Sequence, residues 1–98
     1  MSLSDILVLV KANLGIVAAA TVYDDSLIHL IQVSEEEIKR EGVTLDYCSS
    51  ADINLIVMYT SWMWRKRDAD TGMPRMLRYQ LNNRILSEKA KTSVLTES

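Results

Sequence analysis

The spacing of apolar residues predicts four helices, and no segment carries a strand signal of similar strength. The predicted helices cover residues 5–14, 25–41, 51–67 and 74–91. Along the first two, apolar side chains recur every three or four positions and so share one helical face. These two stripes are Leu3, Ile6, Leu7, Val10 and Leu14, then Leu27, Leu30, Ile31, Ser34 and Ile38. We therefore expect an all-α fold, a compact bundle of about four helices, in one domain over 1–91.

The third predicted helix differs from the others because apolar side chains surround most of its circumference. Between residues 53 and 64 only Asn54 and Ser61, seven positions apart, leave a narrow polar stripe. A helix that is apolar on nearly all sides is stable only when most of its surface is covered. We therefore place this hydrophobic helix at the centre of the bundle.

Capping residues and glycines mark the expected helix ends. Gly15 and Gly42 are expected to end the first and second helices, because glycine adopts the left-handed backbone common after a helix. Segment 16–23 is either a loop or an additional weak turn, and 92–98 is expected to be a frayed tail. The expected N-caps of the first three helices are Ser4, Asp24, and either Ser49 or Ser50. Pro74 is expected in the first position of the fourth helix.

Composition and charge narrow the possible functions. The chain has 98 residues, 48% of them hydrophobic, which is typical of one small globular domain. Its net charge of −2 predicts no bulk attraction to nucleic acid. However, residues 1–52 hold nine acids and three bases, whereas residues 53–98 hold four acids and eight bases. Charge separated in this way can pair internally, or head to tail with a second copy.

Few residues could carry chemistry. His29 is the only histidine and is expected to be structural or surface-exposed; Cys48 is the only cysteine and can form no intrachain disulfide. Together they cannot supply a structural zinc site, no protease signature surrounds Cys48, and the three glycines form no phosphate-binding loop. We expect no enzyme, cofactor or metal. The sequence also shows no membrane span and no signal peptide, which favours an intracellular protein.

The two tryptophans suggest contacts between subunits. Trp62 and Trp64 are two positions apart, so they point roughly 200° apart around a helix. Either both rings lie in the core of the monomer, or one of them faces a neighbouring subunit, where tryptophan is enriched. The acidic second helix is then expected to face a basic surface of that neighbour. The candidate interface residues are Trp62, Trp64, Met58, Glu35, Glu36, Arg75 and Arg78.

Basic residues gather around the turn between the third and fourth helices. Arg65, Lys66 and Arg67 either form a solvated helix end, contact an acidic neighbour, or contact a DNA backbone. We take them as candidate DNA-channel or partner contacts. The alternative function is a small helical nucleic-acid-binding regulator that uses the basic region 65–84.

Several short segments, in order, resemble a known family. They are Leu7-Val8-Leu9-Val10-Lys11 with Leu14-Gly15-Ile16; Asp24-Asp25-Ser26-Leu27-Ile28; Met58-Tyr59, Trp62 and Arg65-Lys66-Arg67; and Gly72-Met73-Pro74-Arg75-Met76-Leu77-Arg78 with Leu81-Asn82-Asn83-Arg84. Over roughly 6–89, the chain resembles the small head–tail connector proteins of tailed bacteriophages and prophages, also called adaptor or head-completion proteins. Ala18, Ala19 and Ala20 match no shared pattern clearly.

The resemblance implies a structural virion protein at the head–tail junction. Such proteins are small and α-helical, and they form a homo-oligomeric ring, often dodecameric, beneath the portal protein after DNA packaging. The ring extends the DNA channel, contacts the passing DNA non-specifically and docks the next connector or tail-completion protein. No catalytic residue, cofactor or membrane contact is implied. Assembly is expected in the host bacterial cytoplasm.

Overall fold

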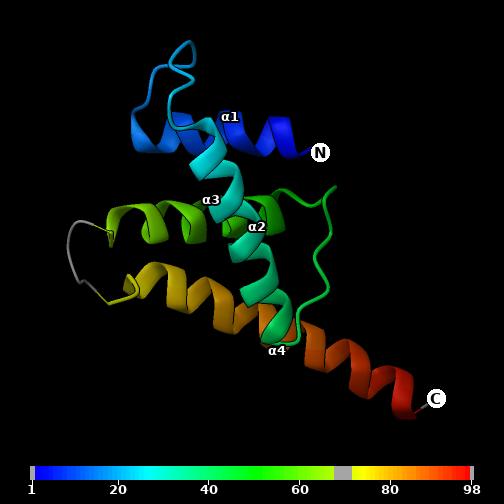
Figure 1. The fold of residues 1–98 in the computed structure, drawn as a ribbon. Coiled ribbons are helices and arrows are strands. Elements are labelled where there is room, and N and C mark those ends of the chain that lie inside the picture. The colour runs from blue at the N-terminus through cyan, green and yellow to red at the C-terminus, as the bar shows by residue number, and fades with distance from the viewer. Residues whose placement is uncertain (1, 68–71, 98) are drawn as a thin grey trace.

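The computed structural model describes residues 2–67 and 72–97, the last six of them by their backbone alone. Within these ranges the chain forms four helices and no strand: α1 (Leu3–Leu14), α2 (Asp24–Arg40), α3 (Ser50–Arg65) and α4 (Arg75–Glu97) (Figure 1). The predicted all-α fold is confirmed. None of these helices is long and apolar enough to cross a membrane.

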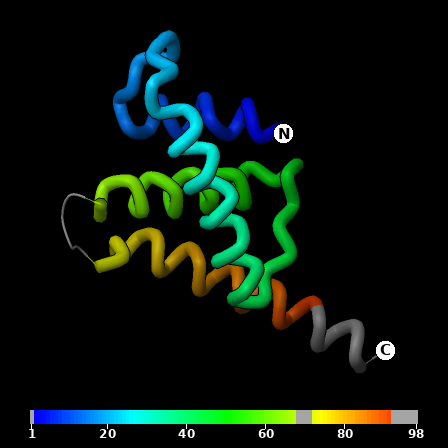
Figure 2. Tube along the Cα trace, viewed as in Figure 1, coloured from blue at the N-terminus to red at the C-terminus, as the bar shows by residue number. Residues whose placement is uncertain are grey.

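Three of the helices form a layer, and the fourth crosses it. α1, α3 and α4 lie side by side with α3 in the middle, while α2 runs diagonally over α1 and α3 (Figures 1 and 2). α1 and α3 run in the same direction, and α4 runs in the opposite one. α3 packs against each of the other helices, so the prediction of a central third helix is confirmed.

The core is formed where α2 lies over this layer. α3 contributes most to it, through Ile53, Leu55, Ile56 and Val57, because apolar side chains surround that helix. The predicted polar stripe of α3 is only half correct: Asn54 is exposed, but Ser61 is buried and accepts a 2.7 Å hydrogen bond from the Asn13 amide. The other core residues are Ile6, Val10, Leu27, Ile31, Ile38, Val43, Leu45, Leu77 and Leu81.

A pair of buried hydroxyls joins α2 to α3. The Ser34 hydroxyl donates to the Ile31 carbonyl at 2.8 Å and lies 2.8 Å from the Thr60 hydroxyl. Because Ser34 has one hydroxyl proton, Thr60 donates to Ser34. Both side chains are fully buried, so each hydroxyl needs the partner that it has. Two small residues here also allow close approach of the helices.

Capping in the structure differs from prediction at two of the first three helices. Ser2 rather than Ser4 caps α1, since the Ser2 hydroxyl accepts from the Asp5 amide and the Asp5 carboxylate accepts from the Ser2 amide. Asp24 is the first residue of α2 rather than its cap, which is Tyr23. Ser49 caps α3 as one of the two expected residues. At α1 and α3 hydrogen-bond geometry thus selects one of two nearby serines, whereas Tyr23 makes no capping hydrogen bond through its side chain.

The remaining helix ends lie close to their predicted places. Gly15 and Gly42 have φ angles of 75° and 98°, and each follows the helix that it was expected to end. α3 ends at Arg65, not at Arg67, with Lys66 as its C-cap. Pro74 was predicted at N1 of the fourth helix, but α4 begins at Arg75, so Pro74 lies one position before N1. Its carbonyl accepts from the Arg78 amide at 3.0 Å.

Two further expectations concern the C-terminal tail, predicted over 92–98, and the segment 16–23. α4 continues to Glu97 rather than ending near residue 91. Segment 15–23 is a loop with hydrogen-bonded turns, which resolves the alternative left open by the sequence.

Lys11 fastens this loop. Its side chain is buried, and its ammonium group donates to the carbonyls of Ala18 (2.9 Å) and Ala20 (2.7 Å) and to the Asp24 carboxylate (2.9 Å). All three ammonium protons therefore have acceptors, which compensates for removing the charge from water. Lys11 thus links α1, the loop and the first residue of α2.

We predict that Lys11→Met lowers the free energy of unfolding by about 3 kcal/mol, because it leaves a partly buried carboxylate and two carbonyls without their donor. Urea unfolding of the purified chain measures the loss. Lys39→Met, at an exposed position of α2, is the matched control and should change stability by less than about 0.5 kcal/mol. Equal effects of the two substitutions would contradict a structural role for Lys11.

Candidate functional site

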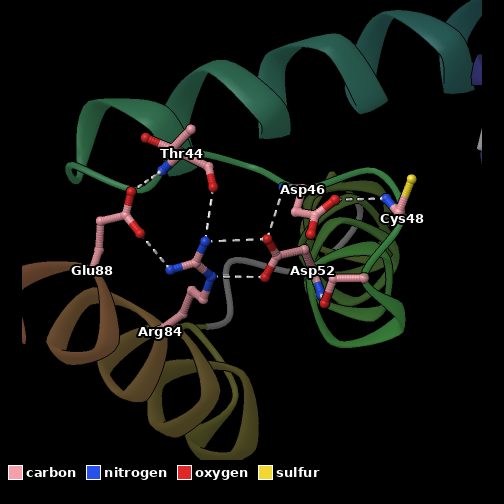
Figure 3. Close-up of polar contacts among 7 residues, drawn as sticks. Thr44, Asp46, Cys48, Asp52, Arg84 and Glu88 are labelled. Carbon is pink, nitrogen blue, oxygen red and sulfur yellow. Dashed lines mark hydrogen bonds and ion pairs between the residues drawn. The ribbon is translucent and has the colours of Figure 1, made fainter. Parts of the chain in front are cut away.

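The most extensive polar cluster surrounds Arg84 on α4 (Figure 3). Its guanidinium group contacts the Asp52 carboxylate at 2.8 and 3.3 Å and the Glu88 carboxylate at 2.8 Å. It also donates to the Thr44 carbonyl at 2.7 Å, while the Thr44 amide donates to Glu88 at 3.1 Å. We call Arg84, Asp52, Glu88 and Thr44 the Arg84 clasp. It joins α4 to the start of α3 and to the α2–α3 connector.

The clasp is extended by the connector itself. Asp52 is buried, and its carboxylate also accepts from the Asp46 amide at 2.8 Å. The Asp46 carboxylate in turn accepts from the Cys48 amide at 2.9 Å, which forms a tight turn. Hydrogen bonds from Arg84 and Thr44 lower the pKa of Glu88 to about 2, and the two carboxylates raise the pKa of Arg84. Arg84 and Glu88 are therefore ionised at neutral pH, and the clasp serves to position α4.

The aromatic rings at the end of α3 lie on two sides of the helix. Trp62 meets Tyr59 edge to face at 5.5 Å, and Trp64 meets Tyr23 in the same way at 5.3 Å. Both tryptophans are half-buried and pack against the hydrophobic core. Both rings thus contact the monomer core and also keep part of their surface uncovered. This arrangement lies between the two alternatives from the sequence, in which both rings are in the core or one faces a neighbouring subunit.

Each of the candidate DNA contacts has a partner within the chain. Lys66 Nζ lies 4.4 Å from the centre of the Trp62 ring, and the Arg67 guanidinium carbon lies 4.1 Å from that of Trp64. Arg65 donates to the Asn13 carbonyl at 3.3 Å. All three side chains are exposed. Cation–π contacts of this kind hold the cations against the helix end but leave them accessible.

The other candidate interface residues spread over three helices. Met58 of α3 is half-buried, with its sulfur 3.4 Å from the Asn54 amide nitrogen. On α2, Glu36 is exposed, but Glu35 is half-buried and accepts a hydrogen bond from the Tyr47 hydroxyl. Burial and this carboxylate raise the pKa of Tyr47 to about 12. The last two candidates, Arg75 and Arg78, are exposed on α4.

Two grooves run along α3 on either side of Asn54. One, of about 600 Å³, lies between α1 and α3, and the other, of about 350 Å³, lies between α3 and α4. Asn54 lines both grooves, and its amide lies 3.4 Å from the Gln80 side-chain oxygen. Residues of α2 line neither groove, so this face of the layer is the one that α2 does not cross.

Large apolar side chains remain exposed on the outer helices of the layer. On α1 these are Leu3, Val8 and Leu9, and on α4 they are Met76, Tyr79 and Leu86. The remaining ones that the structure describes, Val17, Val22 and Tyr23, belong to the α1–α2 loop. Exposed apolar side chains grouped in this way indicate contact surfaces.

The residues that could carry chemistry lie apart from one another. His29 is exposed on α2 and lines a shallow pocket of about 380 Å³ with Asp25 and Arg67. Cys48 is exposed in the α2–α3 connector. Among the residues that the structure describes, no group of three or more His, Cys, Asp or Glu side chains could hold a metal ion.

No family model matches the chain, and no significant match was found among curated proteins or solved structures.

Sequence reasoning missed the two charged centres of the fold. Arg84 was assigned to the basic region 65–84, but its charge is neutralised by Asp52 and Glu88. Lys11 was assigned no role. Lys11 directly follows the buried Val10, and Arg84 lies three positions after the buried Leu81. Each base is therefore next to the core stripe of its helix. A base in that position is a weak signal that its side chain extends along the core to a partner on another segment.

We predict that Glu88 makes the stability of the fold depend on acid pH. Its pKa falls from an ordinary 4.5 to about 2 on folding, so its contribution is fully present above about pH 4.5 and is lost as pH falls toward 2. Urea midpoints of the native chain and of Glu88→Gln should therefore differ at pH 6 and converge as the pH approaches 2. The exposed Glu36→Gln is the control; the same pH-dependent difference in that variant would contradict the role of the clasp.

Proposed function

We propose that this chain is a structural subunit of the head–tail junction of a tailed bacteriophage or prophage, where copies form a ring beneath the portal protein. The supporting observation is that the outer helices of the layer, α1 and α4, both keep exposed apolar side chains while α3 lies between them. One chain thus offers two unlike contact surfaces. Repeated pairing of unlike surfaces produces a ring when the rotation closes.

The position of this ring, between the portal protein and the tail, is proposed from the resemblance in sequence. In the proposed role the subunits contact the portal protein on one side and the next connector or tail-completion protein on the other. The ring extends the DNA channel, and exposed Arg65, Lys66 and Arg67 are the candidates for non-specific contact with DNA or a partner. The role requires no catalysis, cofactor or membrane. Assembly takes place in the host bacterial cytoplasm.

The alternative function, a nucleic-acid-binding regulator, lacks a favouring observation. Arg84, one of the bases of the region 65–84, is held by two carboxylates, so a phosphate contact from Arg84 would have to compete with them. We therefore keep the regulator only as an outcome of the test below.

We predict that the purified chain binds the portal oligomer encoded by the same genome. Size-exclusion chromatography of the mixture should show one complex, and electron microscopy should show an added ring on one end of the portal. A mobility-shift assay on duplex DNA should show only weak, unselective binding that disappears at moderate salt.

Two results would contradict this function. One is a chain that leaves the portal unchanged at concentrations of tens of micromolar, or a genome without a portal gene. The other is submicromolar, sequence-selective DNA binding by the chain alone, which would support the regulator instead.

A further inference from the structure

The outward faces of α1 and α4 differ in charge as well as in position. Counting about 100° per residue, Val8 and Asp5 of α1 lie opposite the buried Ile6 and Val10, while the neighbouring Leu9 is partly exposed and, like Ala12, also lines the groove between α1 and α3. Asp5 accepts hydrogen bonds from Ser2, which lower the pKa of its carboxyl group. The other charged residue of α1, Lys11, is buried and paired with Asp24. The exposed face of α1 is therefore apolar with one negative charge, and we call it the α1 edge.

The outward face of α4 is apolar with positive charge. Met76, Tyr79 and Leu86 lie within an arc of roughly 80°, opposite the inward Leu77 and Leu81. Each of the three is more than 60% exposed. The exposed bases Arg75, Arg78 and Lys89 border this stripe, while the clasp neutralises Arg84 and Glu88. We call this face the α4 edge.

We infer that the α4 edge of one copy packs against the α1 edge of the next, so that the three-helix layers continue from subunit to subunit. This inference rests on the proposed function, because it names the surfaces by which the proposed ring subunits meet. Both edges are apolar, and their charges are opposite. Each edge lies on the far side of α3 from the other, so one copy cannot satisfy both within itself.

The direction of the helices defines the contact further. Because α4 runs opposite to α1, a copy added in the same orientation brings α1 and α4 together antiparallel (Figure 1). Asp5 near the start of α1 then lies toward the C-terminal part of α4, where Lys89 is exposed. Antiparallel packing also places the positive end of one helix dipole beside the negative end of the other.

The α4 edge packs against the α1 edge of a second copy rather than against α2 of that copy. The exposed surface of α2 has mixed charge, since Glu36 is accompanied by Lys39 and by Arg40, which pairs with Glu37 at 2.9 Å. No large apolar side chain of α2 is exposed, as judged over the residues that the structure describes. The α1 edge offers both the apolar surface and the opposite charge that the α4 edge needs.

Blocking one edge at a time tests this pairing. Tyr79→Glu places a negative charge in the α4 edge, and Val8→Arg places a positive charge in the α1 edge. Both positions are exposed, so neither substitution removes a buried side chain. Gln32→Glu on the exposed face of α2 is the matched control. Sedimentation velocity over a concentration series reports association, and circular dichroism confirms that the variants are folded.

The native chain and the control should associate at high concentration, while each edge variant should associate about tenfold more weakly or remain a monomer. An equimolar mixture of the two edge variants should associate more strongly than either variant alone, because the intact α4 edge of one then meets the intact α1 edge of the other. A native chain that stays monomeric at hundreds of micromolar would overturn the inference. So would a Val8→Arg variant that associates like the native chain, which would mean that α4 edges pair with each other.

The same variants separate this inference from the proposed function. If the chain forms a ring on the portal and Tyr79→Glu forms it equally well, the edge pairing is wrong and the function stands. If the edges pair as inferred but no portal complex forms, the pairing stands and the function is wrong.

Discussion

Covering α3 is the constraint on which the rest of this structure depends. Its apolar residues surround most of the helix, so a single neighbour cannot remove enough surface from water. The chain answers with α1 and α4 on either side and α2 across one face. Each of the other three helices therefore buries one face against α3 and exposes the opposite face. Within residues 2–67 and 72–97 there is no further helix to cover α1 and α4, and apolar side chains remain exposed on both.

Charged side chains then hold the covering helices in place. Lys11 ties the start of α2 to α1 through three acceptors, and Arg84 ties α4 to α3 through the clasp. Lys11 uses all three of its ammonium protons, and Arg84 makes four hydrogen bonds through its guanidinium group. Such pairs add little net stability over apolar packing, but removing one partner leaves the other uncompensated. They therefore specify how the helices meet.

The apolar pattern was enough to predict the architecture, because helical periodicity follows from local geometry. It gave the four helices, the central third one, and Gly15 and Gly42 at helix ends. It could not choose Ser2 over Ser4 as a cap, since both are serines near the same helix start. Nor could it pair Arg84 with Asp52, because 32 residues separate them in sequence. The edges were invisible for a similar reason: exposure of Met76 or Val8 depends on which neighbours the fold supplies.

Subunit pairing through the two edge helices is the central claim, and hydrogen exchange of the assembled chain compared with the dilute monomer tests it most directly. If the subunits pair through these edges, assembly slows exchange in peptides from α1 and from residues 75–91 of α4, and leaves exchange in α2 unchanged. Slower exchange confined to α2, or identical exchange in both states throughout α1 and α4, would contradict it.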